Sequence, residues 1–176
     1  MNALTPTQIQ ARAQQQKRQR VSAPQRPVWQ PYTGGPQERA YTSPADVLGY
    51  GGEAGGGKSD LALGLAGTAH WRSLIFRREF PRLGGLIDRS REIFNAAGRP
   101  SGADSYNEAL HRWKLYDGRH IQFAAIQHED GKFNYQGRPH DLYVFDEATE
   151  FSETQVRFVI GWNRSTHIDT ATGAPQ

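Results

Sequence analysis

The chain contains no cysteine, so it can form neither disulfide bonds nor thiolate zinc sites. It also lacks any apolar run that approaches the length of a membrane span, and its N-terminus has no hydrophobic signal-peptide core. Only 36% of its 176 residues are hydrophobic. These absences predict a soluble, cytoplasmic protein without membrane partners, and the length suits a single domain.

Acidic residues are nearly absent from the first 40 positions. This segment holds six Lys and Arg residues against the single acid Glu38, whereas the whole chain has a net charge of +3. Because residues 1–28 are also rich in Gln and Pro, we expect them to form a disordered basic tail that precedes one domain over residues 29–176. Such a tail suits either a polyanion such as nucleic acid or a solubilising role without a partner.

Glycine, in contrast, is concentrated in one motif. The sequence matches G-x-x-x-x-G-K-S without deviation over residues 52–59. Glycine lets the backbone curl so tightly that its N–H groups can surround phosphate oxygens. The motif therefore predicts a loop that binds ATP, in which the lysine reaches the β- and γ-phosphates and the serine hydroxyl holds Mg²⁺. The residues expected to bind the nucleotide are Gly52, Glu53, Ala54, Gly55, Gly56, Gly57, Lys58 and Ser59.

Hydrophobic patterning predicts strands alternating with helices. Asp117-Gly118 separates two alternating runs, at residues 111–115 and 120–124, which is typical of a β-hairpin. The other expected strands cover residues 46–50, 72–78 and 142–145, the last of them central and buried; the expected helices cover residues 58–69, 81–97 and a segment from about 152. This order predicts an α/β domain of three layers with a mostly parallel central sheet.

Two adjacent acids, Asp146 and Glu147, directly follow the apolar run 142–145. A carboxylate at the end of a strand can hold Mg²⁺, and a second one can orient and polarise an attacking water. Adjacent residues leave a strand in different directions, so the two acids can serve these two roles. We expect Asp146 to bind the metal and Glu147 to be the catalytic carboxylate. A solvated acidic strand end is the alternative.

Rapid hydrolysis of a triphosphate also needs a cation near the γ-phosphate. The candidates are Arg77, Arg78, Arg138 and Arg164, each of which could equally be a surface arginine or one member of an ion pair. The six histidines show no H-E-x-x-H spacing, which argues against a histidine metal site.

Taken in order, five segments resemble the ATPase domain of phage terminase large subunits: residues 29–32, 35–37, 51–59, 74–81 and 144–148. The resemblance covers about residues 29–165. It implies a P-loop fold of the additional-strand, RecA-like type. It also implies a motor that moves double-stranded DNA into a procapsid in the host cell cytoplasm. The implied partners are a portal protein, a small terminase subunit and further copies of the chain in a ring.

By this resemblance Lys58 and Ser59 bind phosphates and Mg²⁺, Asp146 holds Mg²⁺ and Glu147 is catalytic. Gln37 resembles a glutamine that contacts adenine, and Arg138 resembles an arginine supplied to a neighbouring subunit. Family members continue into a Thr/Asn-containing strand and a nuclease domain of RNase H-like type. We therefore expect an ATPase domain that is incomplete at its C-terminus, without nuclease activity.

Two other functions remain open. Residues 146–149 also resemble the DEA-type box of helicases, although a helicase would need a second RecA-like domain. A nucleotide-binding interaction module without significant turnover is the other alternative. A GTPase is disfavoured because no N-K-x-D motif is present, and a small-molecule kinase because the two acids are adjacent and no lid is recognisable.

Overall fold

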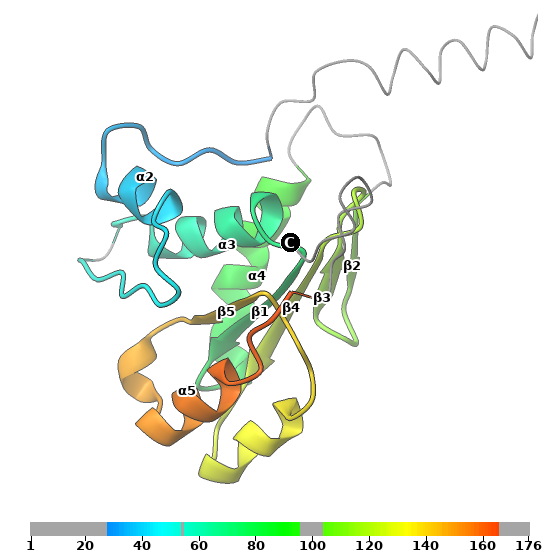
Figure 1. Cartoon of the computed structure of the whole chain (residues 1–176). Coiled ribbons are helices and arrows are strands. Elements are labelled where there is room, and N and C mark those ends of the chain that lie inside the picture. Colours follow the sequence, from blue (N-terminus) through cyan, green and yellow to red (C-terminus); the bar gives the residue numbers. More distant parts are fainter. Residues whose placement is uncertain (1–27, 54, 96–103, 166–176) are drawn as a thin grey trace, which may run out of the picture.

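A computed structural model describes residues 28–53, 55–95 and 104–165, so the predicted tail lies outside the described residues except at Val28. The described part is an α/β domain built on a five-stranded, mixed, open sheet (Figure 1). In spatial order the strands are β2 (Ser105–Asn107), β3 (Arg112–Lys114), β4 (His120–Ala125), β1 (Arg72–Arg77) and β5 (Leu142–Phe145).

The prediction of a mostly parallel sheet is wrong. Strand β1 runs parallel to both β4 and β5, but the β2–β3 and β3–β4 pairs are antiparallel. The reason is that the predicted hairpin joins the main sheet: β4 is at once the second hairpin strand and the parallel neighbour of β1. Half of the strand pairings are therefore antiparallel.

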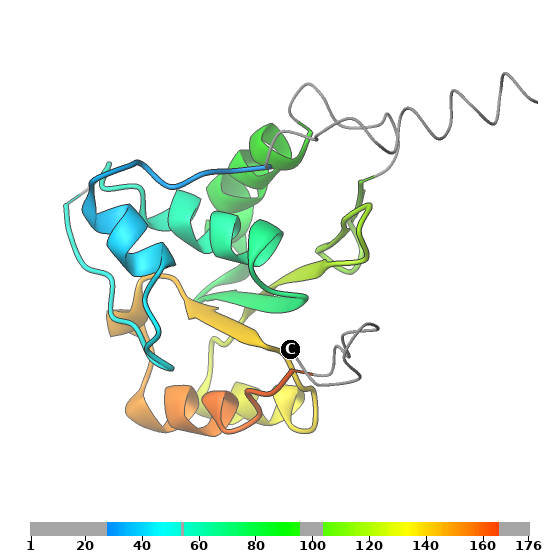
Figure 2. The ribbon, with the colours of Figure 1, turned by 45° about the horizontal axis from the view of Figure 1, so that its top comes forward.

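Helices cover both faces of the sheet (Figures 1 and 2). Helices α3 (Lys58–Thr68) and α4 (Gly84–Phe94) pack on one face against alternate strand residues such as Ile75 and Phe123. On the other face, α5 (Glu153–Ile160) and the 3₁₀ helix η2 (Glu129–Tyr135) cover residues such as Phe76. The alternation of side chains along each strand thus supplies two apolar cores.

Most of the predicted elements are confirmed. Helix α3 and strand β1 lie where the pattern placed them, and the hairpin turns at Gly118, whose φ of 95° suits glycine. The helix expected from Pro81 opens as a 3₁₀ turn, η1 (Phe80–Leu83), and continues as α4. It ends at Phe94, with Asn95 as the cap, a few residues before the expected end near residue 97. Helix α5 begins directly after Ser152, which forms a capping box with Gln155.

Two strand predictions fail. Residues 46–50 form no strand: a short helix, α2 (Pro36–Tyr41), precedes them and the side chain of Val47 is 74% exposed. The apolar pair between Asp46 and Gly49 is too short to direct strand pairing by itself. Residues 142–145 do form β5, but at the sheet edge and only half-buried. The strand is apolar because both cores reach it, not because it is central.

Among the described residues, no helix combines the length and the apolar character needed to cross a bilayer.

Candidate nucleotide-binding site

The glycine-rich loop curls at the start of α3. Its backbone has positive φ at Gly52 (145°), Gly55 (86°) and Gly57 (71°), a conformation that glycine adopts readily and other residues do not. Gly57 is the residue that precedes the helix, and a Cβ there would lie 2.7 Å from the Nε2 atom of Gln37. The left-handed conformation therefore favours glycine at this position, and a side chain there would also displace the Gln37 amide.

The first turn of α3 offers backbone donors to an anion. No side chain caps this end of the helix, and the first N–H groups of a helix have no partner within it. Together with the positive end of the helix dipole, these groups favour a phosphate at this point. Asp60 lies in the same turn and would repel an anion, but Arg89 of α4 pairs with both of its carboxylate oxygens at 2.7 and 2.8 Å.

Lys58 is folded into the loop. Its Nζ atom donates hydrogen bonds to the carbonyl oxygens of Gly52 and Glu53, both at 2.9 Å. The ammonium group is therefore held within the curl of the predicted phosphate loop by acceptors that a phosphate oxygen could replace. Ser59, half-buried, follows it on the helix.

Gln37 connects the N-terminal part of the domain to this loop. Its Nε2 atom donates to the carbonyl of Gly57 at 3.1 Å, and its Oε1 atom accepts from the amide of Tyr32 at 2.7 Å. The structure thus brings Gln37 to the loop across twenty positions of sequence. A contact with adenine remains a prediction.

The adjacent acids lie in different surroundings. Asp146 is buried, and its Oδ2 atom accepts from Nε and Nη2 of Arg77 at 2.8 and 2.7 Å. Glu147 is exposed and has a left-handed backbone (φ 57°, ψ 55°). This conformation costs a residue other than glycine roughly 1–2 kcal/mol, and such strain is often found at functional sites. The two adjacent acids therefore differ both in burial and in backbone conformation.

The loop and the acids lie at the same end of the sheet. The chain passes from the end of α3 at Thr68 to the start of β1 at Arg72 in a few residues, so α3 runs back along β1. The beginning of α3 is therefore near the carboxyl end of β1, which is also the carboxyl end of the parallel strand β5. Figures 1 and 2 both show the loop before α3 on the side where β5 ends.

The four candidate arginines lie at different distances from the acids along the fold, and only one of them contacts Asp146. Arg77 contacts Asp146, whereas Arg78 donates to Oε1 of the buried Gln155 at 2.9 Å. Arg138 and Arg164 lie at the opposite, amino end of β5. There the backbone amide of Arg164 donates a hydrogen bond to the carbonyl of His140, and Asn163 forms an isolated β-bridge with His140. The structure therefore brings neither of these two arginines to the acids of the same chain.

Sequence reasoning named Arg77 as a candidate cation but did not foresee its pairing with Asp146. One signal in the sequence could have indicated this pair. Arg77 ends one apolar strand and Asp146 directly follows another, so the two residues come together if those strands are parallel neighbours. Sequence reasoning also missed the pair between Asp60 and Arg89. These residues belong to two different helices, and residue spacing predicts ion pairs only within one helix.

The residues present suit Mg²⁺ bound together with phosphate. Among the described residues, no group of three or more His, Asp or Glu side chains is close enough to hold a metal by itself. Mg²⁺ is commonly bound by one or two protein oxygens together with substrate phosphates and water. The Asp146 carboxylate and the Ser59 hydroxyl match that donor set.

Comparison of the chain with protein-family models, with curated proteins and with solved structures found no match.

Proposed function

We propose that this domain binds and hydrolyses ATP with Mg²⁺. The observation that carries the proposal is the loop itself: glycines with positive φ lead into α3, and the Lys58 ammonium lies inside the curl. Support comes from the buried carboxylate of Asp146 at the same end of the sheet. A phosphate cradle and a magnesium ligand on one edge of an α/β sheet are the two parts that such chemistry requires.

In this proposal the phosphates replace the carbonyl groups of Gly52 and Glu53 as partners of Lys58. Bound Mg²⁺, held by Ser59 and Asp146, supplies charge neutralisation at the phosphate oxygens. Asp146 would then exchange its pair with Arg77 for the metal, and the released guanidinium would supply a cation at the same end of the sheet. Glu147 accepts a proton from the attacking water and orients it.

We further propose the finer assignment that the resemblance implies. The fold is of the additional-strand, RecA-like type, and the domain belongs to a terminase motor that moves double-stranded DNA into a procapsid. Its partners are the portal protein, the small terminase subunit and other copies of the chain. In such a ring Arg138, remote from the acids of its own chain, acts on the site of a neighbour.

A steady-state ATPase assay on the full chain, with and without double-stranded DNA, tests this proposal. We expect Mg²⁺-dependent turnover that DNA stimulates. Glu147→Gln should bind ATP as the unaltered chain does but lose turnover, whereas Glu153→Gln, which removes an exposed acid on α5, should retain both. Equal loss of binding and turnover in Glu147→Gln would contradict its role with the water.

Nucleotide binding without turnover is the second candidate. The pairing of Asp146 with Arg77 favours it, because an arginine occupies the carboxylate that must bind the metal. ATP binding without measurable hydrolysis, with and without DNA, would select this function over the motor.

A further inference from the structure

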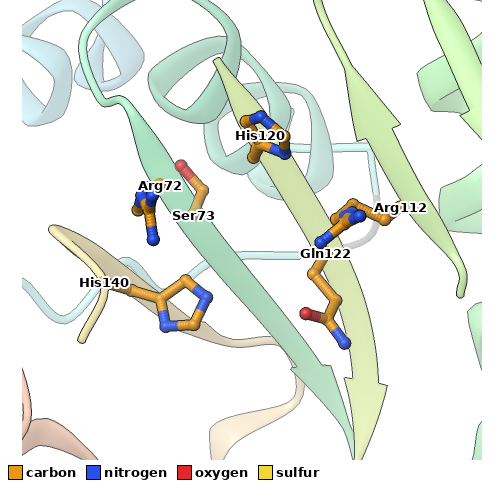
Figure 3. A pocket seen from close by; sticks show the side chains of 6 residues that line it. All are labelled: Arg72, Ser73, Arg112, His120, Gln122 and His140. Carbon is orange, nitrogen blue, oxygen red and sulfur yellow. The ribbon is translucent and has the colours of Figure 1, made fainter. Parts of the chain in front are cut away.

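A basic pocket lies on the α5 face of the sheet, away from the candidate nucleotide site. Its volume is about 130 Å³, which gives room for several waters or one tetrahedral oxyanion. Figure 3 shows its side chains gathered over β1 and β4. The lining residues are Arg72, Ser73, Arg112, His120, Gln122 and His140, none of which is acidic.

The strand pattern explains where the pocket lies. On this face β1 presents Leu74 and Phe76 in its carboxyl half, and these belong to the core under α5 and η2. Two residues before Leu74, the same face carries Arg72. Strand β4 likewise changes from polar to apolar residues along this face: residues 120 and 122 are polar, and Ala124 belongs to the core. The amino half of this face is therefore a basic surface that no core residue covers.

Basic residues come from three neighbouring strands of this face. The register pairs Lys114 with His120 and His120 with Arg72, and it pairs Arg112 with Gln122. Lys114 and Arg72 therefore lie on either side of His120. Among the residues that the structure describes, Arg72, Arg112 and Lys114 form no ion pair. An anion in the pocket would therefore lie near cationic groups that no carboxylate already pairs.

The carboxylate of Asp141, which follows His140 in the chain, is already engaged by the backbone. Asp141 precedes β5, and its two oxygens accept hydrogen bonds from the backbone amides of Trp71 and Arg72, each at 2.7 Å. The carboxylate thus holds the start of β1 instead of lining the pocket. The guanidinium of Arg72 remains available to an external anion.

The imidazole of His120 responds to this positive field. Burial lowers its pKa first, and the nearby charges of Arg112, Arg72 and Lys114 lower it further.

We propose that this pocket binds a phosphate group of a nucleic-acid backbone. The cations continue beyond the pocket on both sides: Lys114 is exposed on β3, and Arg138 lies next to His140, whose Nδ1 atom is 3.0 Å from the Arg138 carbonyl. From β3 to β5 this surface spans about 14 Å, at roughly 4.8 Å per strand. A duplex carries one charge per about 1.7 Å of its axis, so one phosphate fills the pocket while others lie along the flanking cations.

The proposed motor function also requires binding of double-stranded DNA, so this inference rests on that proposal for the kind of partner. The site is nevertheless inferred from charge and geometry alone. It is tested without nucleotide, so its failure and the failure of the ATPase proposal are distinguishable.

The first test measures the affinity of the full chain for a fluorescently labelled DNA duplex by anisotropy. Arg112→Gln should weaken binding about fivefold at 0.15 M salt and reduce the slope of log K against log salt by about one, as expected for the loss of one phosphate contact. Arg157→Gln is the matched control, because it removes an arginine from α5 that is 75% exposed and paired with Glu153. Equal effects of the two changes, or none, would overturn the proposal.

A second variant guards against misfolding. Gln122→Glu is nearly isosteric and places a carboxylate beside Arg112, so the fold should be kept, as circular dichroism can verify, while the anion is excluded. We expect this variant to lose at least as much affinity as Arg112→Gln. Unchanged affinity would refute the site.

Addition of inorganic phosphate distinguishes a phosphate of a nucleic-acid backbone from a free anion as the ligand of the pocket. The ring signals of His120 and His140 in NMR spectra should shift on addition of the duplex, and millimolar phosphate should compete. Saturable shifts with phosphate, together with unchanged duplex affinity in Arg112→Gln, would assign the pocket to a free anion and overturn the nucleic-acid assignment.

Discussion

Two charged side chains of the candidate site are held by partners within the protein. Lys58 is bound by the carbonyl groups of Gly52 and Glu53, and Asp146 by Arg77. A nucleotide with its metal must replace both sets of contacts. Each replacement exchanges one charge-assisted interaction for another, so the site is kept in shape without leaving a buried charge unpaired.

Replacing Lys58 by Ala should weaken ATP binding about 10- to 100-fold, because hydrogen bonds to charged groups contribute about 1.5–3 kcal/mol. Titration calorimetry measures this directly. Arg157→Ala, on the exposed side of α5, provides the control. An affinity within twofold of the unaltered chain would remove Lys58 from the site.

Replacing Arg77 by Gln should lower the melting temperature in the absence of metal, because the carboxylate of Asp146 is 9% exposed and would lose its partner. The increase in melting temperature on addition of Mg²⁺ and ATP should then be larger than in the unaltered chain, since the metal no longer competes with the guanidinium. Differential scanning fluorimetry gives both values. Identical shifts in the two proteins would separate Arg77 from metal binding.

At the scale of elements, a polar network joins η2 to the start of α5. Glu129 accepts hydrogen bonds from Lys132, Thr154 and Ser152, and these contacts lower its pKa from 4.5 to about 2. Ser152 is also the capping residue of α5. The network therefore fixes both helical segments that cover this face of the sheet.

The sign of the pH dependence follows from that shift. A carboxylate with a depressed pKa in the folded state contributes stability that is fully present above pH 4.5 and is lost as the pH falls towards 2. Glu129→Gln should therefore flatten the decline in stability over this interval, as measured by urea unfolding at a series of pH values. Because Glu129 is exposed, the effect should shrink in high salt. Glu153→Gln is the control, and parallel curves for the two variants would contradict the network.

Elements with strong local signals could be predicted from the sequence. The glycine-rich loop with α3, the turn at Gly118 and the cap at Ser152 each depend on a few neighbouring residues. The edge position of β5 could not be predicted, because an apolar run of four residues looks the same at the edge and in the centre of a sheet. The pairing of Arg77 with Asp146 depends on strand order, which short-range patterns do not encode.

At the scale of the whole molecule, the N-terminal part of the described chain packs onto the core. Val28 and Trp29 lie against the apolar cluster beneath α3, and a Cβ at Gly64 of α3 would come within 2.1 Å of the Trp29 ring. The ring also contacts Tyr41 of α2 at 5.7 Å between centroids. The domain therefore includes residues that composition alone would assign to a linker.

Two truncations test where the domain begins. Removal of residues 1–27 should leave the melting temperature unchanged, as the predicted disordered tail requires. Removal of residues 1–29 should lower it by several degrees, because loss of one to two kcal/mol shifts the melting temperature of a domain of this size by about 2–4 °C per kcal/mol. A large loss with the shorter truncation would contradict the boundary, and so would no loss with the longer one.

The hydrogen bond from Gln37 to Gly57 has a practical consequence. It ties α2 to the loop, and α2 in turn carries Tyr41 against the Trp29 indole. Any ligand that reshapes the loop therefore alters the surroundings of a natural fluorophore, so a variant that keeps Trp29 as its single tryptophan would report loop occupancy through its emission, without any added label.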